Sequence, residues 1–187
     1  LQAIKELDEA CLSFCEGQYM DLTFQDQLLV TEAGYLSMIG KKSGALPACG
    51  GSLGAICAGA DGPFIHQISI FGQNLGMASQ LIQDIDELWG PNGNGMTPSN
   101  LIQKKKSLPL IYAFENSSIA VKRELGNIYM KRVLEPEDSS RVIEILNDSG
   151  AKYYSEDRAK ALISECLTSL QTLDIPGDKL TGFESLL

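Results

Sequence analysis

The pattern of hydrophobic and polar positions is helical along nearly the whole chain. Apolar residues recur at intervals of three and four, the period of an amphipathic helix with one buried face. This pattern predicts helices over residues 2–16, 26–41, 64–89, 118–131, 138–147 and 155–173. The alternation of apolar and polar residues that is typical of a half-buried strand is scarce. The sequence therefore predicts an all-α fold.

The segments between these helices differ in composition. Residues 43–62 are rich in Ala and Gly and include Pro47, so we expect a weak or closely packed helix that Pro47 kinks or breaks. Residues 90–95 combine glycine, proline and asparagine and are predicted to form a loop. The polar clusters at 138–140 and 155–157 are typical of helix N-caps.

The size and composition of the chain are those of a globular protein. It has 187 residues, 44% of them hydrophobic and 21% charged, which is enough to bury a core. The sequence contains neither a linker nor a repeat that would divide it. We therefore expect residues 1–187 to be part of a single domain whose helices pack as a bundle.

The net charge of −9 argues against general nucleic-acid binding, which depends on many Lys and Arg contacts to phosphate. The apolar runs are too short for a membrane span, which needs about 20 residues. The chain begins at Leu1 without a visible secretory signal, and we expect a cytoplasmic protein.

Cysteine and histidine provide little candidate chemistry. His66 is the only histidine and lacks a catalytic triad spacing, so we expect a surface or packing role. The five cysteines form no zinc-type cluster and are predicted to be free and mostly buried thiols: Cys11, Cys15, Cys49, Cys57 and Cys166.

Two kinds of charged cluster have alternative interpretations. Helical spacing places Gln83 and Glu87 on one face with Asp84 beside them, which suits either a Mg²⁺ site or a solvated acidic surface. The lysine runs at 41–42 and 104–106 are either solvated surface charges or ligands of a phosphate group.

Four short motifs occur in a fixed order: GQYMDL at 17–22, KSGAL at 42–46, FGQNLGMASQLIQDI at 71–85 and KKSLP at 105–109. In order and spacing they resemble the motifs GQxxDL, KTGxL, FGxxLGxAFQxxDDxxD and KxTLP of the trans-isoprenyl diphosphate synthases, the polyprenyl synthetase family. The resemblance covers essentially the whole chain. It implies a helical bundle of the isoprenoid synthase type, of which this chain lacks the N-terminal helices.

The resemblance implies an enzyme of isoprenoid biosynthesis. Such a prenyltransferase condenses isopentenyl diphosphate with an allylic diphosphate and makes products of the geranylgeranyl or farnesyl class. Its expected cofactor is Mg²⁺, which promotes ionisation of the allylic substrate. The expected assembly is a homodimer, or a heteromer with a catalytic subunit.

The resemblance also assigns roles to individual residues. The implied catalytic residues are Lys42, Lys105 and Gln18, and the implied ligands of the allylic diphosphate are Lys42, Ser43, Gln80 and Lys105. The implied Mg²⁺ ligands are Asp21, Gln83, Asp84 and Glu87.

The sequence departs from the family pattern in its second Asp-rich motif. Gln83 replaces the first acid with a neutral amide, and Glu87 is one methylene longer than the expected aspartate. The first Asp-rich motif of the family belongs upstream of Leu1. Two interpretations follow: part of an active prenyltransferase, or a non-catalytic or regulatory small subunit of a heteromeric synthase.

Overall fold

The structure, a computed structural model, describes residues 1–90, 98–173, 175 and 182. Every element among these residues is a helix, which confirms the predicted all-α class. The elements are α1 (Gln2–Gln25), α2 (Glu32–Ile39), η1 (Gly40–Gly44), α3 (Ala45–Cys57), α4 (Gly62–Trp89), α5 (Ser99–Ile102), α6 (Leu108–Asn116), α7 (Ile119–Met130), α8 (Pro136–Asp148) and α9 (Ala151–Gln171). η1 is a single π-helical turn.

The chain forms two compact units. Unit 1 contains residues 1–18, 37–80 and 159–187, and unit 2 contains residues 19–36 and 81–158. The helices α1, α2, α4 and α9 each contribute residues to both units. The prediction that residues 1–187 belong to a single domain stays a prediction.

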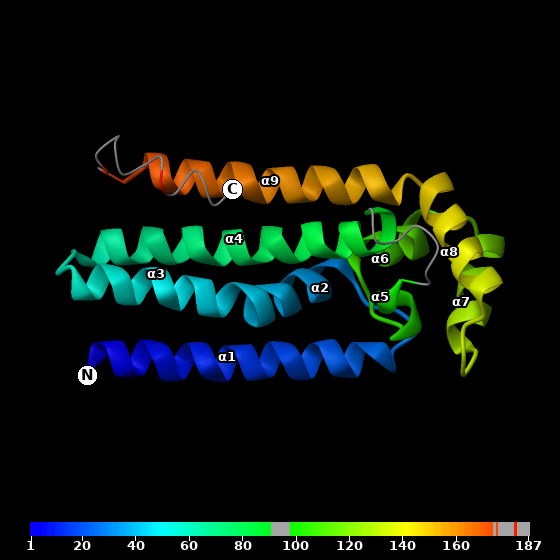
Figure 1. Cartoon of the computed structure of the whole chain (residues 1–187), viewed down its shortest axis with the longest axis horizontal. Helices are drawn as coiled ribbons and strands as arrows, with labels where there is room; N and C mark the ends of the chain where they lie inside the picture. The colour runs from blue at the N-terminus through cyan, green and yellow to red at the C-terminus, as the bar shows by residue number, and fades with distance from the viewer. Residues whose placement is uncertain (91–97, 174, 176–181, 183–187) are drawn as a thin grey trace. The chain divides into compact units, whose positions relative to one another are not determined.

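In unit 1, long helices lie side by side in the order α1, α3, α4, α9 (Figure 1). The Cys49 thiol of α3 donates a hydrogen bond to the carbonyl oxygen of Glu6 in α1, with a sulfur–oxygen distance of 3.7 Å. The Cys166 thiol of α9 donates to the carbonyl oxygen of Phe71 in α4, also at 3.7 Å. An apolar cluster fills the space between α3, α4 and α9: Ala55, Ile68, Phe71, Cys166 and Leu170.

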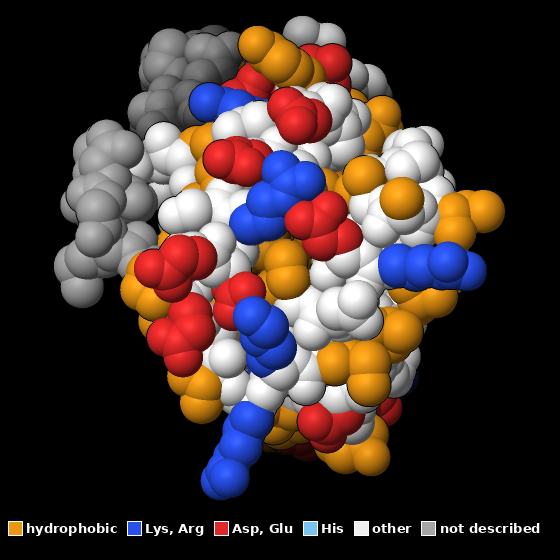
Figure 2. Space-filling model, turned by 90° about the vertical axis from the view of Figure 1, so that its right-hand side faces the viewer, with side chains coloured by type: hydrophobic (Ala, Val, Ile, Leu, Met, Phe, Trp, Pro, Cys, Tyr) orange, Lys and Arg blue, Asp and Glu red, His pale blue; other side chains and the backbone are white. Residues whose placement is uncertain are grey.

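In unit 2, the short helices α6, α7 and α8 share a larger apolar cluster with the end of α4. Its members are buried aliphatic and aromatic side chains: Leu88, Leu101, Leu110, Ala113, Phe114, Leu125, Ile128, Tyr129, Val142, Ile145, Leu146 and Ala151. Figure 2 shows the face that carries α7 and α8, where hydrophobic side chains reach the surface between charged side chains of both signs.

Several predicted helix boundaries are wrong in the first half of the chain. The helix predicted over 2–16 continues to Gln25, and the one predicted over 26–41 begins only at Glu32. Thr31 accounts for the later start, because its hydroxyl accepts a hydrogen bond from the backbone N–H of Gly34 at 3.1 Å, as N-cap residues do. Pro47 does not break α3, which runs from Ala45 to Cys57, and a single π-helical turn, η1, directly precedes α3.

The predicted N-caps at 138–140 and 155–157 are also wrong. α8 begins at Pro136 after the N-cap Glu135, whose backbone N–H donates to the Asp138 carboxylate at 3.1 Å. α9 begins at Ala151, directly after Gly150, whose φ of 76° ends the preceding helix. Ser155 is therefore buried inside α9 and donates to the carbonyl oxygen of Ala151. Residues 91–95 of the predicted loop lie outside the described residues.

The prediction of mostly buried thiols is wrong for three of the five cysteines. Cys11, Cys15 and Cys57 are exposed, whereas Cys49 and Cys166 are buried between helices of unit 1. His66 lies exposed on α4. Among the described helices, none has the length and apolar character that crossing a membrane requires.

Candidate functional site

The basic motif at 40–44 forms the π-helical turn η1, which presents Lys41, Lys42 and Ser43. A π-helical turn is rare and often marks a functional site. The sequence did not predict it. It joins α2 to α3 without a loop, so its basic residues lie on a continuous helical scaffold.

Motif glycines explain how η1 is held in unit 1. A methyl group on Gly17 would lie 2.3 Å from the backbone nitrogen of Lys42, and one on Gly76 would lie 2.1 Å from the carbonyl oxygen of Ser43. A methyl group on Gly72 would lie 2.4 Å from the carbonyl oxygen of Pro47. Because these neighbours are backbone atoms, only glycine permits so close an approach. The motif glycines therefore allow α1 and α4 to pack directly against η1 and the start of α3.

Side-chain contacts distinguish the polar residues of η1. The Ser43 hydroxyl donates a hydrogen bond to Oε1 of Gln80 at 2.8 Å, so two of the predicted substrate ligands come together. The Lys41 ammonium group forms an ion pair with Glu16 at 2.7 Å. Lys42 is half-buried, and the predicted Gln18 is half-buried in the same unit.

A buried tyrosine is hydrogen-bonded to one of the predicted metal ligands in unit 2. The Tyr35 hydroxyl donates to Oδ2 of Asp84 at 2.7 Å, and the two residues are only 1% and 5% exposed. Burial, the charge of Asp84, its hydrogen bond and the charge of Asp21 all raise the pKa of Tyr35 well above its usual value. Asp21 is itself buried. Tyr35 therefore stays a neutral donor to the Asp84 carboxylate.

The other two predicted metal ligands lie in different surroundings. Gln83 is exposed on α4. Oε2 of Glu87 accepts hydrogen bonds from the Ser99 hydroxyl at 2.9 Å and from the backbone N–H of Asn100 at 3.2 Å. The Glu87 carboxylate therefore satisfies donors at the start of α5, as an acidic side chain at a helix N-terminus commonly does.

Within the described residues, the predicted ligands do not fit a complete Mg²⁺ site. No three acidic, histidine or cysteine side chains there lie close enough to share one ion. Asp21 and Asp84 provide carboxylate oxygens, the donors that Mg²⁺ prefers, but Gln83 is neutral and Glu87 already has two donors. The four metal-ligand assignments stay predictions.

The lysine run at 104–106 contains one buried member. Lys106 is 6% exposed, and its ammonium group donates to the carbonyl oxygens of Lys104 at 3.2 Å and Gln25 at 3.4 Å. It also lies 5.0 Å from the centre of the Tyr129 ring. Burial, together with the charge of Lys104, lowers the pKa of Lys106 to about 8. Lys105 is only half-buried, and its backbone N–H donates to the carbonyl oxygen of Asn100 at 2.9 Å.

A profile of the family described as Polyprenyl synthetase matches residues 1–146. The chain belongs to the polyprenyl synthetase family. It is 31% identical over 173 residues to the geranylgeranyl diphosphate synthase of Mycobacterium tuberculosis. This aligned region covers 91% of this chain and 49% of the relative. It is 34% identical over 161 residues to the geranylfarnesyl diphosphate synthase of Aeropyrum pernix. That aligned region covers 85% of this chain and 49% of the relative.

The structural comparison confirms the predicted fold of the isoprenoid synthase type. The crystal structure of the polyprenyl synthetase from Streptomyces coelicolor A3(2) has a TM-score of 0.89 to this chain at 29% identity. That match covers 99% of this chain and 57% of the other. The chain thus spans about half the length of the curated relatives that it matches.

Two residues of this polyprenyl synthetase chain were missed as candidates. Tyr35 lies just before the basic motif. Its hydroxyl group at that position was the feature of the sequence that could have indicated a role. Lys106 carries no sequence signal that separates it from Lys104 and Lys105, because its burial depends on the distant Tyr129 and Gln25.

Proposed function

We propose that this chain is part of a trans-prenyltransferase that condenses isopentenyl diphosphate with an allylic diphosphate. The product is a longer trans-isoprenyl diphosphate of the geranylgeranyl or farnesyl class. The observation that carries the proposal is the 31–34% identity to a geranylgeranyl and a geranylfarnesyl diphosphate synthase over most of this chain. The order of the four motifs adds support.

We assign binding of the allylic diphosphate to Lys42 and Lys105. A lysine ammonium group is a compact positive charge that suits a phosphate group, and it stabilises the charge that develops on a departing diphosphate. The order and spacing of the motifs select these two lysines rather than the neighbouring Lys41 and Lys106. The hydrogen bond between Ser43 and Gln80 fixes a hydroxyl group on η1, the element that carries Lys42. Gln18 is the further polar residue that we assign to this function.

The family resemblance implies that the activity depends on Mg²⁺. A substitution at Gln83 tests whether this chain provides a ligand of the metal ion. Gln83→Asp replaces a neutral amide with a carboxylate, the better Mg²⁺ ligand. We expect it to raise turnover at limiting Mg²⁺, with Gln2→Asp, the same change at an exposed position of α1, as the control. Equal turnover in the two variants would argue against a metal role at position 83.

We also infer a homodimer. Ile4, Leu7 and Leu12 are large apolar side chains that α1 leaves exposed, and burying such a face is a common driving force for association. Sedimentation of the gene product should give twice the mass of its own complete polypeptide, and Leu12→Glu should shift it toward the monomer. A monomer at micromolar concentration would refute the inference.

The direct test is a radiolabelled condensation assay on the complete gene product. It uses isopentenyl diphosphate with dimethylallyl, geranyl or farnesyl diphosphate, with and without Mg²⁺. We expect chain elongation that requires the metal. Failure of folded protein to elongate any of the three would refute the proposal and favour the non-catalytic subunit, which would then co-purify with an active sibling.

Lys105→Ala tests one residue assignment in the same assay. Loss of an ammonium group that binds a diphosphate should raise the KM for the allylic substrate by roughly tenfold or more. Lys5→Ala, which removes the same charge from an exposed position of α1, should leave it unchanged. An unchanged KM in Lys105→Ala would refute the assignment.

A further inference from the structure

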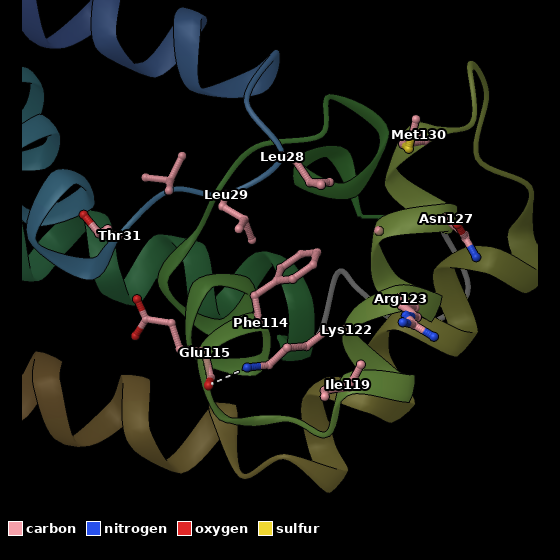
Figure 3. Close-up of a pocket in the computed structure, with 12 residues that line it drawn as sticks. Leu28, Leu29, Thr31, Phe114, Glu115, Ile119, Lys122, Arg123, Asn127 and Met130 are labelled. Atoms are coloured by element: carbon pink, nitrogen blue, oxygen red, sulfur yellow. Dashed lines mark hydrogen bonds between the residues drawn. The ribbon is translucent and has the colours of Figure 1, made fainter.

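Unit 2 contains an apolar cavity that none of the predicted site residues lines. Its volume is about 640 Å³, within the range of cavities that bind small molecules. The segment 28–31 forms one wall, and α7 with the end of α6 forms the other (Figure 3). The apolar lining consists of Leu28, Leu29, Val30, Phe114, Ile119 and Met130.

Gly126 keeps this cavity open. It is buried in the middle of α7, where glycine costs about 1 kcal/mol relative to alanine. A methyl group on Gly126 would meet only Cδ1 of Leu28, at an ordinary contact distance of 3.9 Å. Packing therefore does not require glycine here, in contrast to Gly17 and Gly76. A longer side chain at position 126 would enter the cavity.

The apolar lining is unusually accessible to water. Leu29, Ile119 and Met130 are 65%, 71% and 77% exposed, although all three line the cavity. Exposing such surface is unfavourable, and a hydrocarbon group in the cavity would cover it. The shape and lining thus suit a flexible apolar chain.

The charged side chains around the cavity favour an anion. Lys122, Arg123 and Glu115 line it and together carry one excess positive charge, in a chain whose net charge is −9. The Lys122 ammonium group donates to the backbone carbonyl oxygen of Glu115 at 3.0 Å, a neutral acceptor (Figure 3). Within the described part of the chain, neither Lys122 nor Arg123 forms an ion pair with a carboxylate.

We propose that this cavity binds a single-chain amphiphile with an anionic head group. The hydrocarbon chain lies beside Gly126 and Phe114, and the head group lies at Lys122 and Arg123. The inference goes beyond the proposed prenyltransferase activity and does not depend on it, because it rests only on this cavity.

Calorimetry with dodecyl phosphate, below its critical micelle concentration, tests the proposal. In a Lys42→Ala, Lys105→Ala double variant, which removes the lysines assigned to the allylic diphosphate, we expect one site per chain, weaker binding of dodecanol and no measurable binding of inorganic phosphate or dodecyltrimethylammonium. Gly126→Leu should weaken binding at least tenfold. The matched Gly54→Leu, at a helical glycine with no neighbour within 4 Å, should leave it unchanged. A dodecanoate arm shows whether a carboxylate head group binds as well as a phosphate head group.

Two further variants keep the test decisive if Gly126→Leu does not fold. Arg123→Gln should weaken dodecyl phosphate binding severalfold, whereas Arg132→Gln, which removes the same charge outside the cavity lining, should not. Ile119→Asp places an acid in the exposed lining and should weaken binding further. Binding that is equal in all variants, or equal for dodecanol and dodecyl phosphate, would overturn the proposal. The proposal would also be overturned if Gly126→Leu changed the oligomeric state of the protein but left its binding of dodecyl phosphate unchanged.

Discussion

The two units hold their candidate lysines by different physical means. In unit 1, Lys42 lies on a π-helical turn against which α1 and α4 pack through glycines, with backbone atoms in direct contact. In unit 2, Lys105 lies between Lys104, whose φ is positive at 54°, and Lys106, whose charge is buried against a ring and two carbonyl groups. Steric fit positions the first lysine, and polar contacts position the second.

The sites of the two lysines should therefore differ in their sensitivity to substitution and to pH. A site that depends on backbone contact should tolerate no added atom but should respond little to pH. A site that depends on a buried ammonium group should tolerate changes of shape better and should respond to pH. The variants below test this contrast, from the largest expected effect to the smallest.

Gly76→Ala should give the largest loss of stability. Its methyl group would lie 2.1 Å from the carbonyl oxygen of Ser43, so helices must move apart, at a cost of about 3 kcal/mol or more in the free energy of unfolding. Gly54→Ala is the matched control and should stabilise α3 by up to about 1 kcal/mol. Urea unfolding measures both. Similar effects of the two changes would contradict the role assigned to close helix packing.

Tyr35→Phe should cost about 1–3 kcal/mol, because it leaves the buried Asp84 carboxylate without its 2.7 Å donor. Tyr19→Phe makes the same change at an exposed position and should be nearly neutral. Thermal unfolding of both variants separates loss of the hydrogen bond from loss of a hydroxyl group. A neutral Tyr35→Phe would show that the contact contributes no net stability.

Lys106 should make stability depend on pH. Because its pKa falls from 10.5 in the unfolded chain to about 8 in the folded one, the unfolded chain binds more protons between these values. Stability should therefore rise with pH over this range, by about 1–2 kcal/mol after allowance for partial solvation. Lys106→Met should lack this rise, whereas Lys5→Met should retain it. Parallel curves for wild type and Lys106→Met in urea unfolding at pH 7.5–10.5 would contradict the burial of a charged lysine.

Glu87→Gln should have the smallest effect, about 1 kcal/mol. It weakens the hydrogen bonds that Ser99 and Asn100 donate at the start of α5. Asp86→Asn neutralises the adjacent exposed acid and should change stability by less than about 0.5 kcal/mol. Chemical unfolding in the absence of metal measures both. Equal stabilities would show that Glu87 does not stabilise α5.

Local patterns predicted the helices that carry strong amphipathic periodicity. The range predicted over 64–89 differs from α4 by only two residues at its start, because its apolar face is continuous. The prediction failed where tertiary contacts decide the outcome. The turn η1 depends on close packing by Gly17 and Gly76 from distant helices, and no local pattern encodes that approach.

In the candidate site, too, the sequence did not predict the features that depend on tertiary contacts. Motif order was sufficient to recognise the family and to select Ser43 and Gln80, which are 37 positions apart and hydrogen-bonded. It did not separate Lys106 from its neighbours, because only the fold places Tyr129 beside it. It also assigned Glu87 to a metal site without revealing its hydrogen bonds to α5.

The most direct test compares the adjacent lysines of η1 in the binding of an allylic diphosphate. Isothermal titration of the gene product with geranyl diphosphate would measure Kd for wild type, Lys42→Ala and Lys41→Ala. The account predicts that Lys42→Ala weakens binding roughly tenfold or more, whereas Lys41→Ala, which removes only an exposed ion pair, changes Kd less than about twofold. Equal effects, or a larger effect of Lys41→Ala, would contradict it.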